Sequence, residues 1–103
     1  MAGAKKKATN KTIKPGKDII ASMSDDFRKK LLKVVNGGIR ELTIDLTGVN
    51  MVDSVGLGVI IATHNSLDDL GGSLKLKNVS EDIYRLIRTM RLDQHFGVTP
   101  VKA

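Results

Sequence analysis

The feature that most constrains the fold of this chain is a regular exchange between apolar patterns of period two and period 3.6. Residues 41–46 (ELTIDL) and 73–77 (SLKLK) alternate apolar and polar side chains, as strands with one buried face do. Segments with helical spacing surround them, and the glycine pairs at 37–38 and 71–72 end two of these segments. Because strands that alternate with helices favour parallel strand–helix–strand units, the pattern predicts an α/β fold.

Three helices are predicted from apolar residues that recur on one helical face. The first begins with Ser22 or Ser24 as its N-cap, and its buried face is formed by Phe27, Leu31, Val34 and Val35. The second runs from about residue 54 to 70. Ser80 caps the third, whose buried stripe is Ile83, Leu86, Ile87 and Met90. Residues 12–14 and 17–20 are each a candidate short edge strand, and 97–101 is a candidate last strand. The prediction is one domain with a mixed, mostly parallel sheet of about four strands, covered by three main helices.

The positive charge of the chain is confined to its first residues. The net charge is +6, and residues 1–17 hold six lysines and no acid, so the rest of the chain is neutral. A lysine-rich segment with little apolar surface cannot order itself. We therefore predict a flexible basic tail at 1–17 and a folded domain at 18–103. A tail that contacts nucleic acid or an anionic membrane is the minor alternative, so no direct nucleic-acid partner is expected.

Several classes of function are disfavoured by the composition. The chain has no cysteine and no apolar run near the 20 residues of a membrane span, so a cytoplasmic protein is expected. No metal-ligand cluster or phosphate-binding loop occurs, and no metal or cofactor is predicted. His64 lies ten residues after Ser54 on the same helix, about 15 Å along its axis, which is too far for a catalytic pair. His64 is read as a hydrogen-bonded, partly buried residue, and we expect no enzyme.

A helical projection divides the second predicted helix into two faces. Its core face carries Leu57, Ile60, Ile61, His64 and Leu67. Its other face is small or polar, so that a protein partner could approach closely, and consists of Ser54, Gly58, Ala62, Asn65 and Asp69, with Val55 and Ser66 beside it.

Ser54 stands where a helix N-terminus is expected. A phosphate there would add a charge of about −1.5 to −2, which the N-terminus tolerates and a docked partner with acidic groups does not. Modification would then switch an interface and leave the fold intact. The plainer alternative is that Asp53 and Ser54 are ordinary N-cap residues, and that Gly56 and Gly58 serve close packing.

The central segment resembles the STAS domain of anti-sigma-factor antagonists. The matching residues are a strand end, Asp45-Leu46, an apolar pair, Met51-Val52, and the helix start Asp53-Ser54-Val55-Gly56. The resemblance extends from about residue 18 to 96. It implies that Ser54 is the serine that an anti-sigma factor with serine kinase activity phosphorylates, that Asp53 is the acidic residue beside it, and that a serine phosphatase resets it.

The resemblance and the helical projection together define a predicted partner-binding surface, which consists of Asp53, Ser54, Val55, Gly56, Gly58, Ala62, Asn65 and Asp69. The unphosphorylated protein is expected to sequester the kinase and so free a sigma factor. The alternative is a constitutive STAS scaffold or accessory subunit of another signalling or transport complex, in which Ser54 is only a helix cap. The oligomeric state stays open, a homo-oligomer included.

Overall fold

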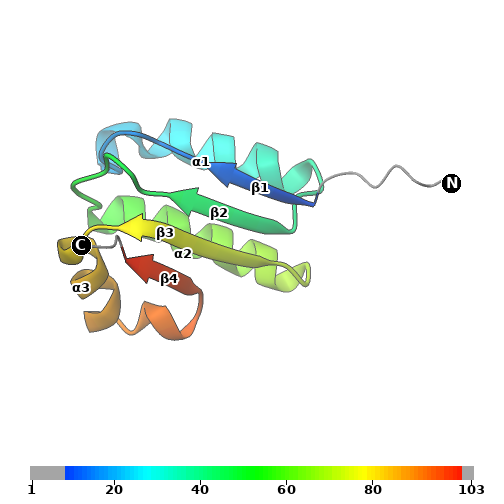
Figure 1. Cartoon of the computed structure of the whole chain (residues 1–103). Coiled ribbons are helices and arrows are strands. Elements are labelled where there is room, and N and C mark those ends of the chain that lie inside the picture. The colour runs from blue at the N-terminus through cyan, green and yellow to red at the C-terminus, as the bar shows by residue number, and fades with distance from the viewer. Residues whose placement is uncertain (1–8, 101–103) are drawn as a thin grey trace, which may run out of the picture.

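The structure is a computed structural model that describes residues 9–100, and its helices and strands alternate as predicted (Figure 1). In chain order the elements are β1 (Asn10–Ile13), α1 (Ala21–Asn36), β2 (Glu41–Asp45), α2 (Ser54–Asp69), β3 (Ser73–Val79), α3 (Glu81–Thr89), the 3-10 helix η1 (Leu92–Gln94) and β4 (Gly97–Pro100). The strands form one sheet in the order β1-β2-β3-β4, and every neighbouring pair is parallel. The predicted α/β domain with four strands and three main helices is confirmed, but the sheet of the described residues is parallel throughout and not mixed.

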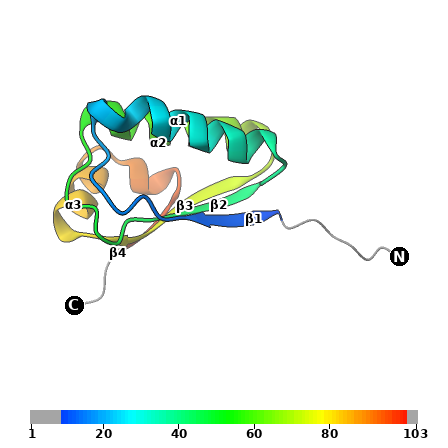
Figure 2. The same cartoon turned by 90° about the horizontal axis from the view of Figure 1, so that it is seen from above.

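The two long helices cover one face of the sheet. Figure 2 shows α1 and α2 side by side on this face, while α3 lies at the end to which the strands point in Figure 1. The central strands alternate accordingly, because successive side chains of a strand point to opposite faces. Leu42, Ile44, Leu74 and Leu76 are buried under the helices, and each such side chain contributes about 1.5–3 kcal/mol to the free energy of unfolding. The opposite face is polar.

The predicted basic tail contains the first strand of the sheet. Residues 10–13 pair in parallel with β2, and Ile13 is only 4% exposed. The short strand expected near 12–14 is present and begins two residues earlier. The flexible segment expected over 1–17 is wrong for residues 10–13, because one buried isoleucine and a ladder of backbone hydrogen bonds hold the strand in place despite its lysine. Lysine is common on edge strands, where it discourages aggregation. Residues 1–8 of the predicted tail lie outside the described part of the chain.

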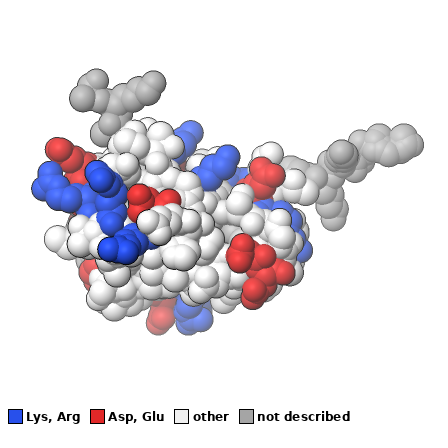
Figure 3. All heavy atoms as spheres, turned by 90° about the horizontal axis from the view of Figure 1, so that it is seen from below, with Lys and Arg blue, Asp and Glu red and all other residues white. Residues whose placement is uncertain are grey.

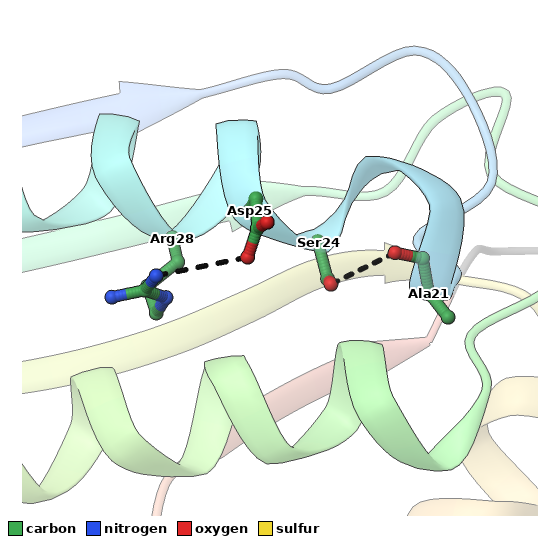
Figure 4. A network of polar contacts seen from close by, with 4 residues as sticks. All are labelled: Ala21, Ser24, Asp25 and Arg28. Carbon is green, nitrogen blue, oxygen red and sulfur yellow. Dashed lines mark hydrogen bonds and ion pairs between the residues drawn. The ribbon is translucent and has the colours of Figure 1, made fainter.

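The first helix begins at Ala21, before both predicted caps. Its N-cap position is Ile20, which makes no side-chain capping bond, so neither Ser22 nor Ser24 is the cap. The Ser24 hydroxyl instead donates to the carbonyl oxygen of Ala21 at 2.9 Å (Figure 4). The missing cap comes from a distant part of the sequence, because Oδ2 of Asp53 accepts the Ala21 N–H.

The third helix is capped by Ser80, as predicted, through a 3.4 Å bond from the Ile83 N–H. Its predicted stripe is only half buried, since Leu86 and Met90 are 37% and 50% exposed. Leu86 and Met90 are exposed because α3 packs on η1 and β4 at the end of the sheet, where only a narrow face of the helix is buried.

Basic side chains gather at the α3 end of the face shown in Figure 3, with acidic ones among them. In α3, Arg85 pairs with Glu81 at 3.6 Å, and Arg88 lies over the ring of Tyr84 at 5.8 Å from its centroid. With these local partners, the arginines of α3 form an ordinary solvated helix face.

Candidate functional site

The loop that leads into α2 is fastened to the segment that leads into α1. The Ile19 N–H donates to the Met51 carbonyl at 2.9 Å, and the Asp53 N–H donates to the Ile19 carbonyl at 3.1 Å. One carboxylate oxygen of Asp18 accepts the N–H groups of Asn50 and Met51 at 2.8 and 3.1 Å. The residues before Ser54 are thus held on both sides by backbone and carboxylate hydrogen bonds.

Asp53 caps both long helices. Its Oδ1 accepts the Gly56 N–H of α2 at 2.8 Å, and its Oδ2 accepts the Ala21 N–H of α1 at 2.9 Å. These bonds, the one from Gly56 first, lower the pKa of the Asp53 carboxyl, because they stabilise its ionised form. The residue predicted as a neighbour of the phosphorylation site is therefore also the point where the two helix starts are joined.

Ser54 is the first residue of α2 and is exposed to solvent. The side chain that caps α2 is Asp53 and not Ser54. This corrects the alternative in which Ser54 is only a helix cap. The Ser54 hydroxyl stands at the positive end of the helix, where an added phosphate meets a favourable dipole.

Gly56 is a packing residue. It is buried, and a Cβ atom built on it would overlap the carbonyl oxygen and side chain of Ile19. Its place in the predicted partner-binding surface is therefore wrong. A Cβ atom at Gly58, one turn from Ser54, would meet nothing within 4 Å.

The remaining predicted positions on α2 share one exposed face. Leu57, Ile60 and Leu67 are buried on the opposite side, while Ile61 and His64 are partly buried. The helix therefore has the core face and the open face that its sequence predicts. We name the open face the α2 surface, which consists of the exposed residues Ser54, Val55, Gly58, Ala62, Asn65 and Asp69. Partner binding by this surface stays a prediction.

A shallow groove continues the α2 surface towards α1. It has a volume of about 170 Å³, and Ala62 and Thr63 line it from α2, Arg28 and Leu32 from α1. Arg28 lies on the side of α1 that faces α2 and pairs with Asp25 at 3.6 Å (Figure 4). The groove gives a partner helix or loop a partly apolar place to rest beside α2.

Sequence reasoning missed two exposed apolar side chains near this surface. Met51 is 56% exposed just before the helix, and Leu32 is 43% exposed in the groove wall. The exposure of Leu32 could have been predicted, because Leu32 lies next to Leu31 but outside the predicted buried face of the first helix. Met51 was read together with Val52 as an apolar pair, but only Val52 is buried.

The loop after β2 is held by a second aspartate. Oδ1 of Asp45 accepts the Thr47 hydroxyl at 2.7 Å, the Thr47 N–H at 3.0 Å and the amide of Asn78 at 3.0 Å. These bonds, led by the Thr47 hydroxyl, lower the pKa of Asp45 from 3.8 to about 2. The Asp45-Leu46 pair of the resemblance thus has a structural role at the strand end.

His64 is partly buried, as predicted, but it is not hydrogen-bonded through Nδ1. That atom is buried with no hydrogen-bond partner, and the ring packs edge-on against Phe96 with centroids 5.4 Å apart. Within residues 9–100, no group of three or more His, Cys, Asp or Glu side chains could hold a metal ion. Among the helices of the same residues, none combines the length and apolar character that a bilayer crossing requires.

Comparison with known proteins assigns this architecture to a family. The family model of the STAS domain matches residues 3–103. The chain belongs to the STAS domain family. The match begins well before residue 18, in agreement with the strand at residues 10–13, so this STAS domain starts earlier than its charge distribution suggests.

Relatives of this STAS domain carry regulatory names. The "Anti-sigma-B factor antagonist" of Bacillus subtilis (strain 168) is 44% identical over 60 residues, which make up 58% of this chain and 54% of that protein. The match thus spans about half the length of the relative.

Two structures share the fold. A Thermotoga maritima protein described as a candidate anti-sigma factor antagonist has a TM-score of 0.84 at 24% identity, over 88% of this chain and 79% of its own. The anti-sigma factor antagonist SpoIIAA in its unphosphorylated form has a TM-score of 0.72 at 14% identity, over 96% and 86%.

Proposed function

We propose that this chain is an anti-sigma-factor antagonist, which binds an anti-sigma factor through the α2 surface and loses this binding when Ser54 is phosphorylated. The observation that carries the proposal is the position of Ser54. It is exposed at the first residue of α2, while Asp53 supplies the capping hydrogen bond. The serine is thus accessible to an enzyme and is not needed to hold the helix.

The relatives support the same proposal. The B. subtilis protein is named an antagonist of an anti-sigma factor, and SpoIIAA is described in an unphosphorylated form. The partner expected here is an anti-sigma factor that is itself a serine kinase. A serine phosphatase then reverses the modification, and both reactions take place in the cytoplasm.

The switch follows from the charge that phosphorylation adds. A phosphate on Ser54 brings about −1.5 to −2 charges to the helix N-terminus, whose N–H groups and dipole stabilise anions. The fold therefore tolerates the phosphate. A partner packed on Val55 and Gly58 loses contact instead, because the phosphate must be desolvated against it. In this proposal the chain is a binding module, and the chemistry belongs to the partner enzymes.

Phosphorylation is tested by incubating the full chain with a candidate anti-sigma factor kinase and ATP, and reading the intact mass. One added phosphate is expected on the wild type and on Ser22→Ala, and none on Ser54→Ala. Ser22 is a matched control, because it is an exposed serine in the first turn of the other long helix. Modification of Ser54→Ala to the same extent would place the phosphate elsewhere and contradict the proposed switch.

The charge mechanism is tested separately by partner binding. Ser54→Asp is expected to weaken binding of the anti-sigma factor, and Ser54→Ala to retain it, because only the aspartate adds a negative charge at the helix start. Equal affinities of the two variants would contradict the charge mechanism. If both bind as tightly as the wild type and no kinase modifies Ser54, the chain is a constitutive STAS scaffold.

A further inference from the structure

The sheet has an open edge at β1. Within residues 9–100, β1 pairs with β2 alone. The Thr9 carbonyl accepts the N–H groups of Arg40 and Glu41, so residue 9 turns its peptide group towards β2. Because these groups alternate between the two sides of a strand, Asn10 and Thr12 direct theirs outward. An edge of this kind is a template for another strand.

Two adjoining hollows lie between this edge strand and α1. One, of about 120 Å³, is lined by apolar side chains that include Ile13 and Phe27. The other, of about 350 Å³, is lined in part by Val34 and Ile39. Lys30 lines both, so the hollows adjoin. We name them together the β1–α1 groove, formed chiefly by Lys11, Ile13, Lys17, Lys30, Lys33 and Val34.

The rim of the groove is positively charged. Lys11, Lys17, Lys30 and Lys33 line it and are exposed, against one carboxylate, that of Asp26. The two ion pairs found in the described part of the chain, Asp25–Arg28 and Glu81–Arg85, leave these lysines out. The groove thus combines open backbone groups, an apolar floor and a basic rim.

We propose that the β1–α1 groove binds an extended, acidic segment of a partner protein as an added strand. The open groups of Asn10 and Thr12 would pair with the backbone of the segment, which is the common mode of strand addition. Every second side chain of the segment points towards α1, so apolar residues at some of these positions enter the hollows and acidic residues at the others meet the lysines of the rim. Residues 1–8 of this chain carry three lysines and no acid, which is the wrong charge for this groove.

This second surface is separate from the α2 surface. Arg28 and Leu32 of α1 face the groove beside α2, whereas Lys30 and Lys33 line the groove beside β1. In Figure 1, α1 lies behind β1 and α2 behind β3. The proposal therefore does not depend on Ser54, and either surface can fail its test while the other stands.

The charge requirement is tested with a fluorescein-labelled octapeptide, Thr-Val-Thr-Glu-Thr-Val-Thr-Glu, whose valines and glutamates share one face of an extended strand. It is titrated with the full chain and followed by fluorescence anisotropy. Saturable binding is expected, and Lys30→Glu/Lys33→Glu should weaken it roughly tenfold or more, because both contacts become repulsive. Lys29→Glu is the matched control, on the same helix but outside both hollows, and should bind within about twofold of wild type. The same octapeptide with lysines in place of its glutamates should not bind.

The backbone requirement is tested at Thr12. Thr12→Pro removes an outward N–H without touching the ladder to β2, since proline is tolerated on edge strands. Thr12→Ala removes the same side chain and keeps the N–H. We expect Thr12→Pro to weaken peptide binding about tenfold more than Thr12→Ala. Chemical-shift mapping on the wild type gives a second reading that needs no variant, with the shifts expected at residues 10–13 and at Lys30 and Lys33.

Four results would overturn the proposal. The first is no saturable binding of the acidic peptide, and the second is equal binding of the basic one. The third is that chemical shifts change on α2 while β1 stays unperturbed. The fourth is that the groove has another occupant. This would be a second copy of the chain if sedimentation shows a dimer that Lys30→Glu/Lys33→Glu dissociates. It would be a membrane if vesicles with phosphatidylserine bind through these lysines while the peptide does not.

Discussion

Asp53 uses its two carboxylate oxygens for two different helices. Oδ1 accepts from Gly56 and Oδ2 from Ala21, which lies 32 residues earlier in the chain. A single N-cap requires one acceptor atom, and Asn and Asp serve equally well in that role. A double cap requires two acceptors, which a carboxylate has and an amide lacks.

Substitutions at Asp53 should therefore separate the two caps. Asp53→Asn keeps one cap and loses the other, so its urea midpoint should fall between those of the wild type and Asp53→Ala. Ser80→Ala, which removes the single cap of α3 at a cost of about 1 kcal/mol, should lower the midpoint less than Asp53→Ala does. Urea denaturation followed by circular dichroism measures all three. Equal midpoints for Asp53→Asn and the wild type would show that the Ala21 bond contributes nothing.

The low pKa of Asp45 makes stability depend on acidity. Above about pH 5 the carboxyl is ionised in both the folded and the unfolded chain, and its hydrogen bonds stabilise the fold fully. As the pH falls from 3.8 towards about 2, the unfolded chain takes up the proton first, and this contribution is lost. Acid should therefore lower the free energy of unfolding in this window.

The Thr47 hydroxyl is the main cause of that low pKa. Thr47→Val should move the pKa of Asp45 back towards 3.8, as followed by NMR titration of the Asp45 carboxyl carbon. Thr43→Val, on the same sheet face but without a hydrogen bond to Asp45, is the control and should leave the titration unchanged. A Thr47→Val protein that still titrates near 2 would assign the shift to the two remaining donors, the Asn78 amide and the backbone N–H of residue 47.

At the scale of elements, α2 carries two glycines with opposite roles. Gly56 lies against the backbone of Ile19, while Gly58 faces open space. Gly56→Ala should therefore destabilise the fold by about 1–3 kcal/mol or more, as overpacking does. Gly58→Ala should stabilise it by about 0.5–1 kcal/mol, since alanine is the better helix former. Thermal denaturation measures both, and a stable Gly56→Ala protein would contradict the close packing of the two helix starts.

Gly58→Ala also reports on the α2 surface. Its added methyl group stands in the proposed interface and should weaken binding of the anti-sigma factor although the domain is more stable. Surface plasmon resonance with the purified partner measures this effect. Unchanged affinity would move the interface away from the first turns of α2.

The elements that sequence reasoning located best are those with long patterns. α2 was expected from Ser54 to Leu70 and runs to Asp69, because its apolar residues and closing glycines mark both ends. The start of α1 was misplaced, because its N-terminus is capped by Asp53, and no local pattern reveals a partner 32 residues away. Burial of Gly56 escaped prediction for the same reason, since it depends on contact with Ile19.

At the scale of the whole molecule, the strand and helix order followed from the sequence, whereas the outer edge strand was located only roughly, near 12–14 within a segment expected to be flexible. Leu42, Ile44, Leu74 and Leu76 alternate with polar residues, so β2 and β3 were predictable as half-buried strands. β1 has one buried apolar residue, Ile13, among lysines, and its strand form comes from pairing with β2. Within the candidate site, the exposed face of α2 was predictable from helical periodicity. The exposure of Met51 was not, because it depends on the hydrogen bonds that hold its loop, such as the one from the Met51 N–H to Asp18.

The central claim is that phosphorylation of Ser54 changes binding and leaves the fold intact. The most direct measurement is isothermal titration calorimetry of the anti-sigma factor with phosphorylated and unphosphorylated chain, with melting curves of both forms. We expect the phosphate to weaken binding about 100-fold or more, equal to about 2.7 kcal/mol, while the melting temperature changes little. Equal affinities, or a phosphorylated chain that binds weakly because it has unfolded, would contradict it.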